Sequence, residues 1–211
     1  THSWPSSDLE MMQQSVGDYI NNEQFHAYYM TFSGHGPYSD ANNICVDNID
    51  TVRKLAAGKG YGETALYYLA ANYELEKAMT YLLDQLEQAG QLENTVIVMT
   101  TDHYPYGFKD ENVLYAESGV EDALLLEKTP FFIWSANGPS MEVTKTCNTS
   151  DILPTVLNLM GVESPYEYIG QDAFDESYAG YALFSNGSWV SNGVAYSTLS
   201  GLMVLEDGKE V

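Results

Sequence analysis

The chain has 211 residues, and its 30 Asp plus Glu against 8 Lys plus Arg give a formal net charge of −22. Nucleic acids and anionic membrane surfaces bind basic faces, so this balance argues against both classes of partner. The apolar fraction of 45% is typical of a folded protein, and no run of about 18 apolar residues predicts a transmembrane helix.

The amino-terminal part predicts a helix, then a strand, then a loop. Ser6-Ser7-Asp8 offers capping side chains for a helix over residues 9–20, where apolar side chains recur at helical spacing. Residues 28–32 form a strand-like run, and the polar, Asn-rich stretch at residues 38–48 predicts a loop.

A long helix is predicted next, from about residue 63 to residue 89, with Gly90 as its stop. It leads into the apolar, β-branched run at residues 95–100, which reads as a buried strand. A helix between two strand-like runs predicts a parallel βαβ unit, so we expect an α/β fold with a mostly parallel sheet flanked by helices.

The carboxyl-terminal part continues the alternation. A proline introduces an apolar strand at residues 129–134, and Asn148-Thr149-Ser150-Asp151 caps a helix that Gly161 closes. The tail alternates short strand-like pieces with turns, at residues 186–190 and 203–208, where Asp207-Gly208 is a hairpin signal. This predicts a small antiparallel part at the end of the chain.

Asp102 and His103 are the strongest chemical signal, because they follow the predicted strand at residues 95–100. Open α/β sheets place their chemistry at the carboxyl ends of strands, and both side chains are good ligands for a divalent metal. Adjacent residues on an ideal strand point to opposite faces, so they share one metal only if a loop has begun. The alternative is an Asp that caps a turn beside a packed His.

His35 is the second candidate, since it lies between Gly34 and Gly36 with Pro37 behind them. Small neighbours let a ligand approach closely and leave the imidazole exposed. It can serve as a metal ligand, a general acid or a donor to a bound anion, or be a turn residue without a task.

The remaining signals are weaker. His26 and His2 read as structural or free, and Cys45 and Cys147 match no zinc spacing, so they are either a disulfide or two buried thiols. No GxSxG, HExxH, P-loop or GxGxxG motif is present.

Taken together, the segments resemble the sulfatase-like branch of the alkaline phosphatase superfamily, and within it the lipoteichoic acid synthase and phosphoglycerol transferase family. The segments that carry the resemblance are residues 4–8 leading into 14–15, residues 29–38 (YMTFSGHGPY), residues 98–104 (VMTTDHY), residues 129–131 with 148–155 and 169–172, and residues 185–189. Gly34 departs from the pattern, because relatives often carry Asn there.

The resemblance implies that residues 1–211 are the carboxyl-terminal portion of one catalytic domain, with an α/β core at about 1–162 and a strand-rich end at about 163–211. It implies that Asp102 and His103 hold one divalent metal, Mn²⁺ before Mg²⁺, Ca²⁺ or Zn²⁺, and that His35 holds the substrate phosphate. A threonine nucleophile and further metal ligands are expected upstream, so no catalytic residue is assigned within the chain.

The implied function is that of an enzyme: an extracellular phosphoglycerol transferase acting on phosphatidylglycerol, anchored in the cell membrane by helices that precede the missing amino-terminal half. The chain alone is expected to be inactive and to bind metal weakly. Two alternatives remain open: a sulfatase or phosphodiesterase acting on another phosphate or sulfate ester, and a non-catalytic binding or sensor module that kept the fold.

Overall fold

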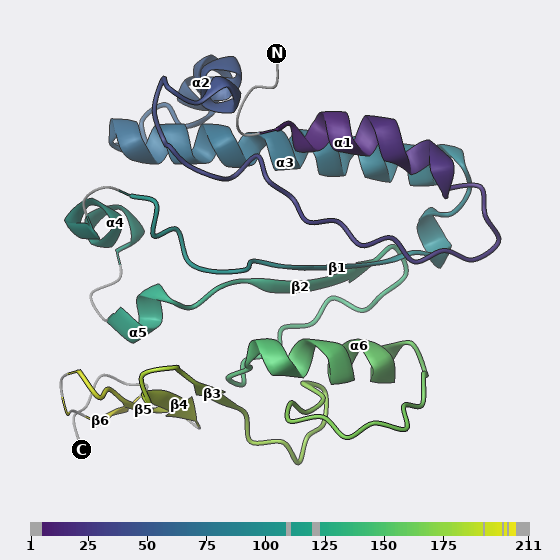
Figure 1. Cartoon of the computed structure of the whole chain (residues 1–211), viewed down its shortest axis with the longest axis vertical. Helices are drawn as coiled ribbons and strands as arrows, with labels where there is room; N and C mark the ends of the chain where they lie inside the picture. Colours follow the sequence, from purple (N-terminus) through teal and green to yellow (C-terminus); the bar gives the residue numbers. More distant parts are fainter. Residues whose placement is uncertain are drawn as a thin grey trace. The chain divides into compact units, whose positions relative to one another are not determined.

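The computed structural model describes residues 6–108, 111–119, 123–191, 193–199, 201 and 203–205. The chain forms two compact units, Thr1–Gly138 and Pro139–Val211. Helices dominate the first unit, and the second combines one helix with a small sheet (Figure 1). Among the described residues, no helix is both long and apolar enough to cross a lipid bilayer.

The first unit is built on three packed helices, and side chains fix where two of them begin. Helix α1 (Asp8–Ser15) starts after Ser7, whose hydroxyl accepts the N–H of Glu10, and continues as a 3₁₀ turn, Val16–Asp18. Helix α2 (Asn43–Leu55) starts after Asn42, which accepts two backbone N–H groups. Helix α3 (Glu63–Gln88) packs against both, and Figure 1 shows α1 lying along it.

The long helix matches its prediction closely, and Gly90 ends it with a positive φ of 67°. Its apolar face meets α1 in the main core, which consists of Met12, Val16, Ile20, Ala78, Leu82 and Leu86. Burying each of the larger side chains contributes about 1.5–3 kcal/mol, so this core holds the helical layer together.

Strand β1 (Val96–Thr100) and strand β2 (Phe131–Ser135) confirm two predicted strands. They pair antiparallel, with Val98 opposite Ile133. The 3₁₀ turn Leu92–Asn94 precedes β1, and the short helices α4 (Glu111–Ser118) and α5 (Ala123–Leu126) connect the strands.

Two predictions for the first unit are wrong. Residues 28–32 are extended but form no strand within the described part of the chain, so the parallel βαβ unit with β1 is not built. The N–H of Phe32 donates to the carboxylate of Asp8 instead of to a neighbouring strand. The predicted loop at residues 38–48 becomes helix α2 from Asn43 onward, because the Asn42 side chain nucleates a helix in a polar stretch.

The second unit confirms the predicted cap and the antiparallel end. Asn148 and Asp151 form a capping box before the 3₁₀ turn Thr149–Asp151 and helix α6 (Ile152–Leu159), and Gly161 follows with a φ of 63°. The sheet has the order β3-β4-β5-β6, antiparallel throughout, with strands Tyr181–Leu183, Trp189–Ser191, Val194–Tyr196 and Met203–Leu205. The predicted Asp207-Gly208 turn lies outside the described residues.

A buried carboxylate organises this second unit. Asp151 is fully buried, and its side chain accepts the N–H groups of Asn148 and Gln171 and the hydroxyl of Tyr178, each at 2.8 Å. A Cβ at Gly170 would lie 1.9 Å from the carbonyl oxygen of Ser150, so only glycine lets the chain pass here. Asp151 is therefore a structural carboxylate.

Candidate functional site

The candidate site begins where β1 ends. Asp102 and His103 lie in an irregular loop after Thr100, so the alternation of a strand no longer separates their side chains. His103 Nε2 lies 3.2 Å from Asp102 Oδ2, and both side chains are exposed. The two side chains can share one metal only if the strand has given way to a loop, and the structure meets this condition.

The protonation of His103 follows from its other nitrogen. Nδ1 lies 2.8 Å from the carbonyl oxygen of Tyr104, which can only accept, so Nδ1 carries a proton. In the neutral ring the lone pair is then on Nε2 and faces the Asp102 carboxylate. Two acceptors at this distance need a proton or a cation between them.

A divalent cation fits this pair. Two neighbouring ligands that each lie about 2.1 Å from one ion, at tetrahedral or octahedral angles, are roughly 3.0–3.4 Å apart, which includes the observed separation. The hydroxyl of Thr101, next to Asp102, is buried and has no hydrogen-bond partner in the described part of the chain, so the loop has unused polar capacity.

The pair alone does not complete a metal site. Within the described residues, no group of three or more His, Cys, Asp or Glu side chains is placed to hold a metal. Since a metal held by protein normally takes three or four protein ligands, Asp102 and His103 supply part of a coordination shell.

His35 lies in a second exposed loop. Its Nδ1 is 2.9 Å from the carbonyl oxygen of Gly36, and its ring stacks on Phe32 with centroids 5.4 Å apart and planes 18° apart. By the same reasoning the proton of the neutral ring is on Nδ1, and Nε2 is an acceptor in that ring or a second donor in an imidazolium. The Cβ that Gly34 lacks would lie 3.2 Å from Asn72 Oδ1, so α3 closely backs this loop.

Aromatic side chains join the two loops. The rings of Tyr38, from the His35 loop, and Phe108, from the Asp102–His103 loop, have centroids 5.3 Å apart, and Tyr68 of α3 packs on both. A Cβ at Gly107 would lie 3.3 Å from the Tyr38 ring, so the loops approach closely. Burial, and then nearby groups that include Asp102, raise the pKa of Tyr38 to about 12. His35 and the Asp102–His103 pair thus share one end of the first unit.

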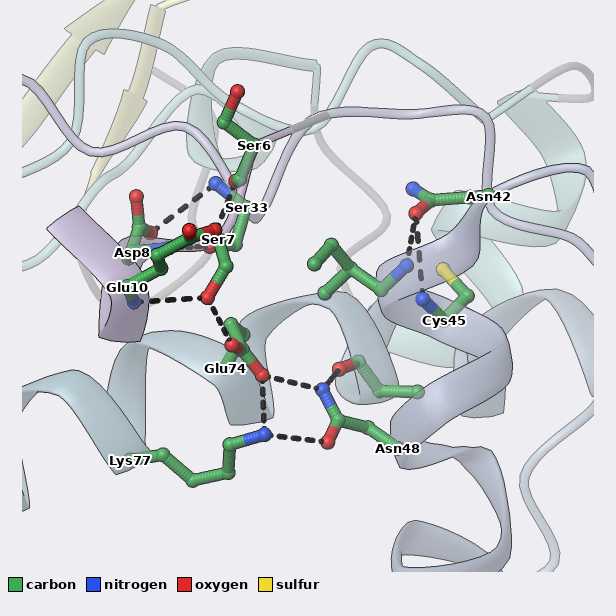
Figure 2. A network of polar contacts seen from close by, with 12 residues as sticks. Ser6, Ser7, Asp8, Glu10, Ser33, Asn42, Cys45, Asn48, Glu74 and Lys77 are labelled. Atoms are coloured by element: carbon green, nitrogen blue, oxygen red, sulfur yellow. Dashed lines mark hydrogen bonds and ion pairs between the residues drawn. The ribbon is translucent and has the colours of Figure 1, made fainter. Parts of the chain in front are cut away.

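A buried polar network supports this end of the unit, and the sequence did not reveal it. Glu74 of α3 accepts hydrogen bonds from Ser7 and Asn48 and pairs with Lys77, which also donates to Asn48 at 3.1 Å (Figure 2). The network ties α1 and α2 to α3. The sequence offered one signal of this network, since the acidic Glu74 lies among the apolar positions of a helix.

The remaining sequence candidates are two cysteines and two histidines. Cys45 and Cys147 are free thiols, and burial raises the pKa of Cys45 to about 11. His26 is exposed, and His2 lies outside the described residues.

Comparison with known proteins places the chain in a family. A family model for sulfatases matches residues 5–162. The chain is 24% identical over 206 residues to the lipoteichoic acid synthase-like protein YvgJ of Bacillus subtilis, covering 92% of this chain and 32% of that protein. Its identity to lipoteichoic acid synthase 2 of the same organism is 26% over 187 residues, covering 85% of this chain and 27% of that protein.

The structural comparison agrees. The chain superposes on the lipoteichoic acid synthase LtaP from Listeria monocytogenes with a TM-score of 0.73 and 22% identity, covering 97% of this chain and 53% of that chain. The α/β fold class is thereby confirmed, and the described strand pairs, in two sheets, are all antiparallel. The expected family resemblance is confirmed by the family model and the curated relatives. The chain spans about a third or less of the length of these curated relatives. With three quarters of its length matched, the chain belongs to the sulfatase family.

Proposed function

We propose that the chain is the carboxyl-terminal part of the catalytic domain of a metal-dependent phosphoglycerol transferase of the lipoteichoic acid synthase type. The observation that carries this proposal is the Asp102–His103 pair, 3.2 Å apart after β1, at the same end of the unit as His35. The similarity to lipoteichoic acid synthases over most of the chain supports it.

In this proposal Asp102 Oδ2 and His103 Nε2 hold one divalent metal, with Mn²⁺ expected before Mg²⁺, Ca²⁺ or Zn²⁺. The bound metal would supply charge neutralisation at the phosphate and a lowered pKa of the attacking hydroxyl. The Nδ1–H bond of His103 to the Tyr104 carbonyl fixes the tautomer whose lone pair is on Nε2 and aims that lone pair at the ligand position.

His35 is proposed to hold the substrate phosphate. With its Nδ1 occupied by the Gly36 carbonyl, the ring presents Nε2, and protonation there gives a cationic donor for a non-bridging phosphate oxygen. In a chain with a net charge of −22, such a local donor matters, because the surrounding surface repels anions.

The nucleophile is proposed to be a threonine upstream of residue 1. Its hydroxyl oxygen bonds to phosphorus as diacylglycerol leaves from phosphatidylglycerol, and an acceptor hydroxyl then displaces the threonine. Helices upstream would anchor the parent protein in the cell membrane, with the domain outside the cell. An immunoblot of cell fractions tests this: a membrane band much larger than 23.4 kDa supports it, and a soluble band at that mass contradicts it.

The activity test uses the full-length protein in membranes with labelled phosphatidylglycerol and Mn²⁺, measuring diacylglycerol release and glycerol phosphate transfer. Asp102→Ala or His103→Ala should each lower the rate about a hundredfold or more, because metal stabilisation is worth several kcal/mol. Asp84→Ala, at an exposed position on α3, is the matched control and should be neutral.

The outcomes separate the alternatives. Release of the head group to water alone, or cleavage of a sulfate ester, would support a hydrolase of the same family in place of the transferase. Activity that survives both Asp102→Ala and His103→Ala would contradict the proposed metal site. Inactivity of the full-length protein on every phosphate and sulfate ester tested would favour a binding module.

A further inference from the structure

The His35 loop is held by buried polar side chains that come from outside the loop. On its amino-terminal side, Asp8 is 2% exposed, and its two carboxylate oxygens accept the N–H of Phe32 at 2.7 Å and the N–H of Ser33 at 3.1 Å. The backbone N–H of Asp8 donates in return to Ser33 Oγ at 2.8 Å. Three hydrogen bonds thus fix the two residues that lead into the turn, and Figure 2 shows those between Asp8 and Ser33.

These bonds reach His35 through Phe32. The N–H of His35 donates to the carbonyl oxygen of Phe32 at 3.1 Å, and the Phe32 ring stacks on the imidazole. The Asp8 carboxylate therefore fixes both the backbone turn and the ring that supports the histidine. Hydrogen bonds to a buried charged group are the strongest that a backbone N–H forms, so this clamp is stiff.

A second buried side chain holds the carboxyl-terminal side of the loop. Asn42 is fully buried, and its Nδ2 donates to the carbonyl oxygen of His35 at 3.0 Å. Its Oδ1 accepts the N–H groups of Ile44 and Cys45 and so caps α2. The amide thus links His35 directly to the start of a helix.

The two holding groups belong to one frame. Asp8 opens α1 and Asn42 precedes α2, and Glu74 of α3 ties both helices together through Ser7 and Asn48 (Figure 2). Asp8 and Asn42 are at most 2% exposed, too little to meet a substrate, so they act through the loop that they hold.

We infer that Asp8 and Asn42 are positioning residues for His35, which fix its imidazole for the binding of a phosphate group. The inference rests on the proposed function for the identity of the ligand alone. Loss of either group lets the loop sample other conformations, and the apparent affinity for phosphate falls with the fraction of competent loops. If that fraction drops to about one tenth, the dissociation constant rises about tenfold.

The test is a nuclear magnetic resonance titration of the 211-residue chain with inorganic phosphate, observed at the His35 imidazole. Asp8→Asn preserves size but sets an amide N–H₂ against a backbone N–H, so one clamp bond is lost. We expect shifted Phe32, Ser33 and His35 signals, unchanged α3 signals and about tenfold weaker phosphate binding. Glu10→Gln removes a charge from the same helical turn at an exposed position, and should change none of these.

Asn42→Asp keeps the test decisive if Asp8→Asn does not fold. Aspartate caps α2 as well as asparagine does, but its second oxygen cannot donate to the His35 carbonyl and faces that acceptor instead, so the change acts on the link to the loop. A folded variant whose His35 signals and phosphate affinity equal those of the parent chain would overturn the inference.

Failure of the proposed function has a different signature. If phosphate leaves the His35 signals of the unaltered chain unchanged, His35 is not the phosphate ligand. Displaced His35 signals in the phosphate-free variants would then still support positioning, and undisplaced signals would refute it.

Discussion

Removing the Glu74 carboxylate is the perturbation whose effect the structure specifies best. Glu74 is 4% exposed and contacts Ser7, Asn48 and Lys77, so Glu74→Ala deletes three polar contacts at once. The donor groups of Lys77 and Asn48 that faced the carboxylate then lose their acceptor in a largely buried environment.

The expected loss is about 3–5 kcal/mol in the free energy of unfolding of the first unit, the range found when one partner of a buried ion pair is removed. With a urea slope of about 2–3 kcal/mol/M, the transition midpoint falls by roughly 1–2.5 M. The surface variant Glu76→Ala, two residues along the same helix, should change the free energy by less than about 0.5 kcal/mol.

Urea titration followed by far-ultraviolet circular dichroism suits this test, because α1, α2 and α3 all belong to the first unit and dominate its helical signal. Equal midpoints for Glu74→Ala and Glu76→Ala would refute the reasoning, since the network would then contribute nothing beyond a solvated surface charge.

Three further predictions follow. Burial raises the pKa of Glu74, but hydrogen bonds from Asn48, Lys77 and Ser7 lower it more, so the net shift is downward. The stability that this carboxylate contributes is therefore complete above about pH 4.5 and is lost as the pH falls through the lower pKa of the folded state. Urea titrations of Glu74→Gln at a series of pH values should lack this component. Gly170→Ala should destabilise the second unit by over about 2 kcal/mol in thermal unfolding, whereas Gly17→Ala, with open space, should not. Burial raises the pKa of both thiols, to about 11 for Cys45, but Cys45 is fully buried and Cys147 only partly, so Cys45 should be alkylated more slowly at pH 8; equal rates by mass spectrometry would contradict this.

Local signals in the sequence identified the elements that depend on local interactions. The long helix and its end at Gly90, and the capping box of Asn148 and Asp151, depend on periodicity, capping side chains and positive φ. Asp102, His103 and His35 were identified from their positions after strand-like runs and between glycines.

What the sequence did not reveal depends on partners far along the chain. A strand needs a neighbour, and the backbone at residues 28–32 is instead anchored by Asp8, about 24 positions earlier. The start of α2 depends on the Asn42 side chain, which accepts two backbone N–H groups. The polar, Asn-rich sequence around it is equally typical of a loop, so it did not reveal the helix. The approach of the two site loops depends on the packing of Tyr38, Tyr68 and Phe108, which no motif encodes.

The binding of metal by Asp102 and His103 is the central claim, and paramagnetic broadening by Mn²⁺ tests it most directly. Substoichiometric Mn²⁺ added to the chain should broaden the His103 imidazole signals before those of His26, an exposed histidine of the same unit, and Asp102→Ala should abolish the selectivity. Broadening that is equal at both histidines, or that survives Asp102→Ala, would contradict the site and leave only the attraction of a cation to an acidic surface.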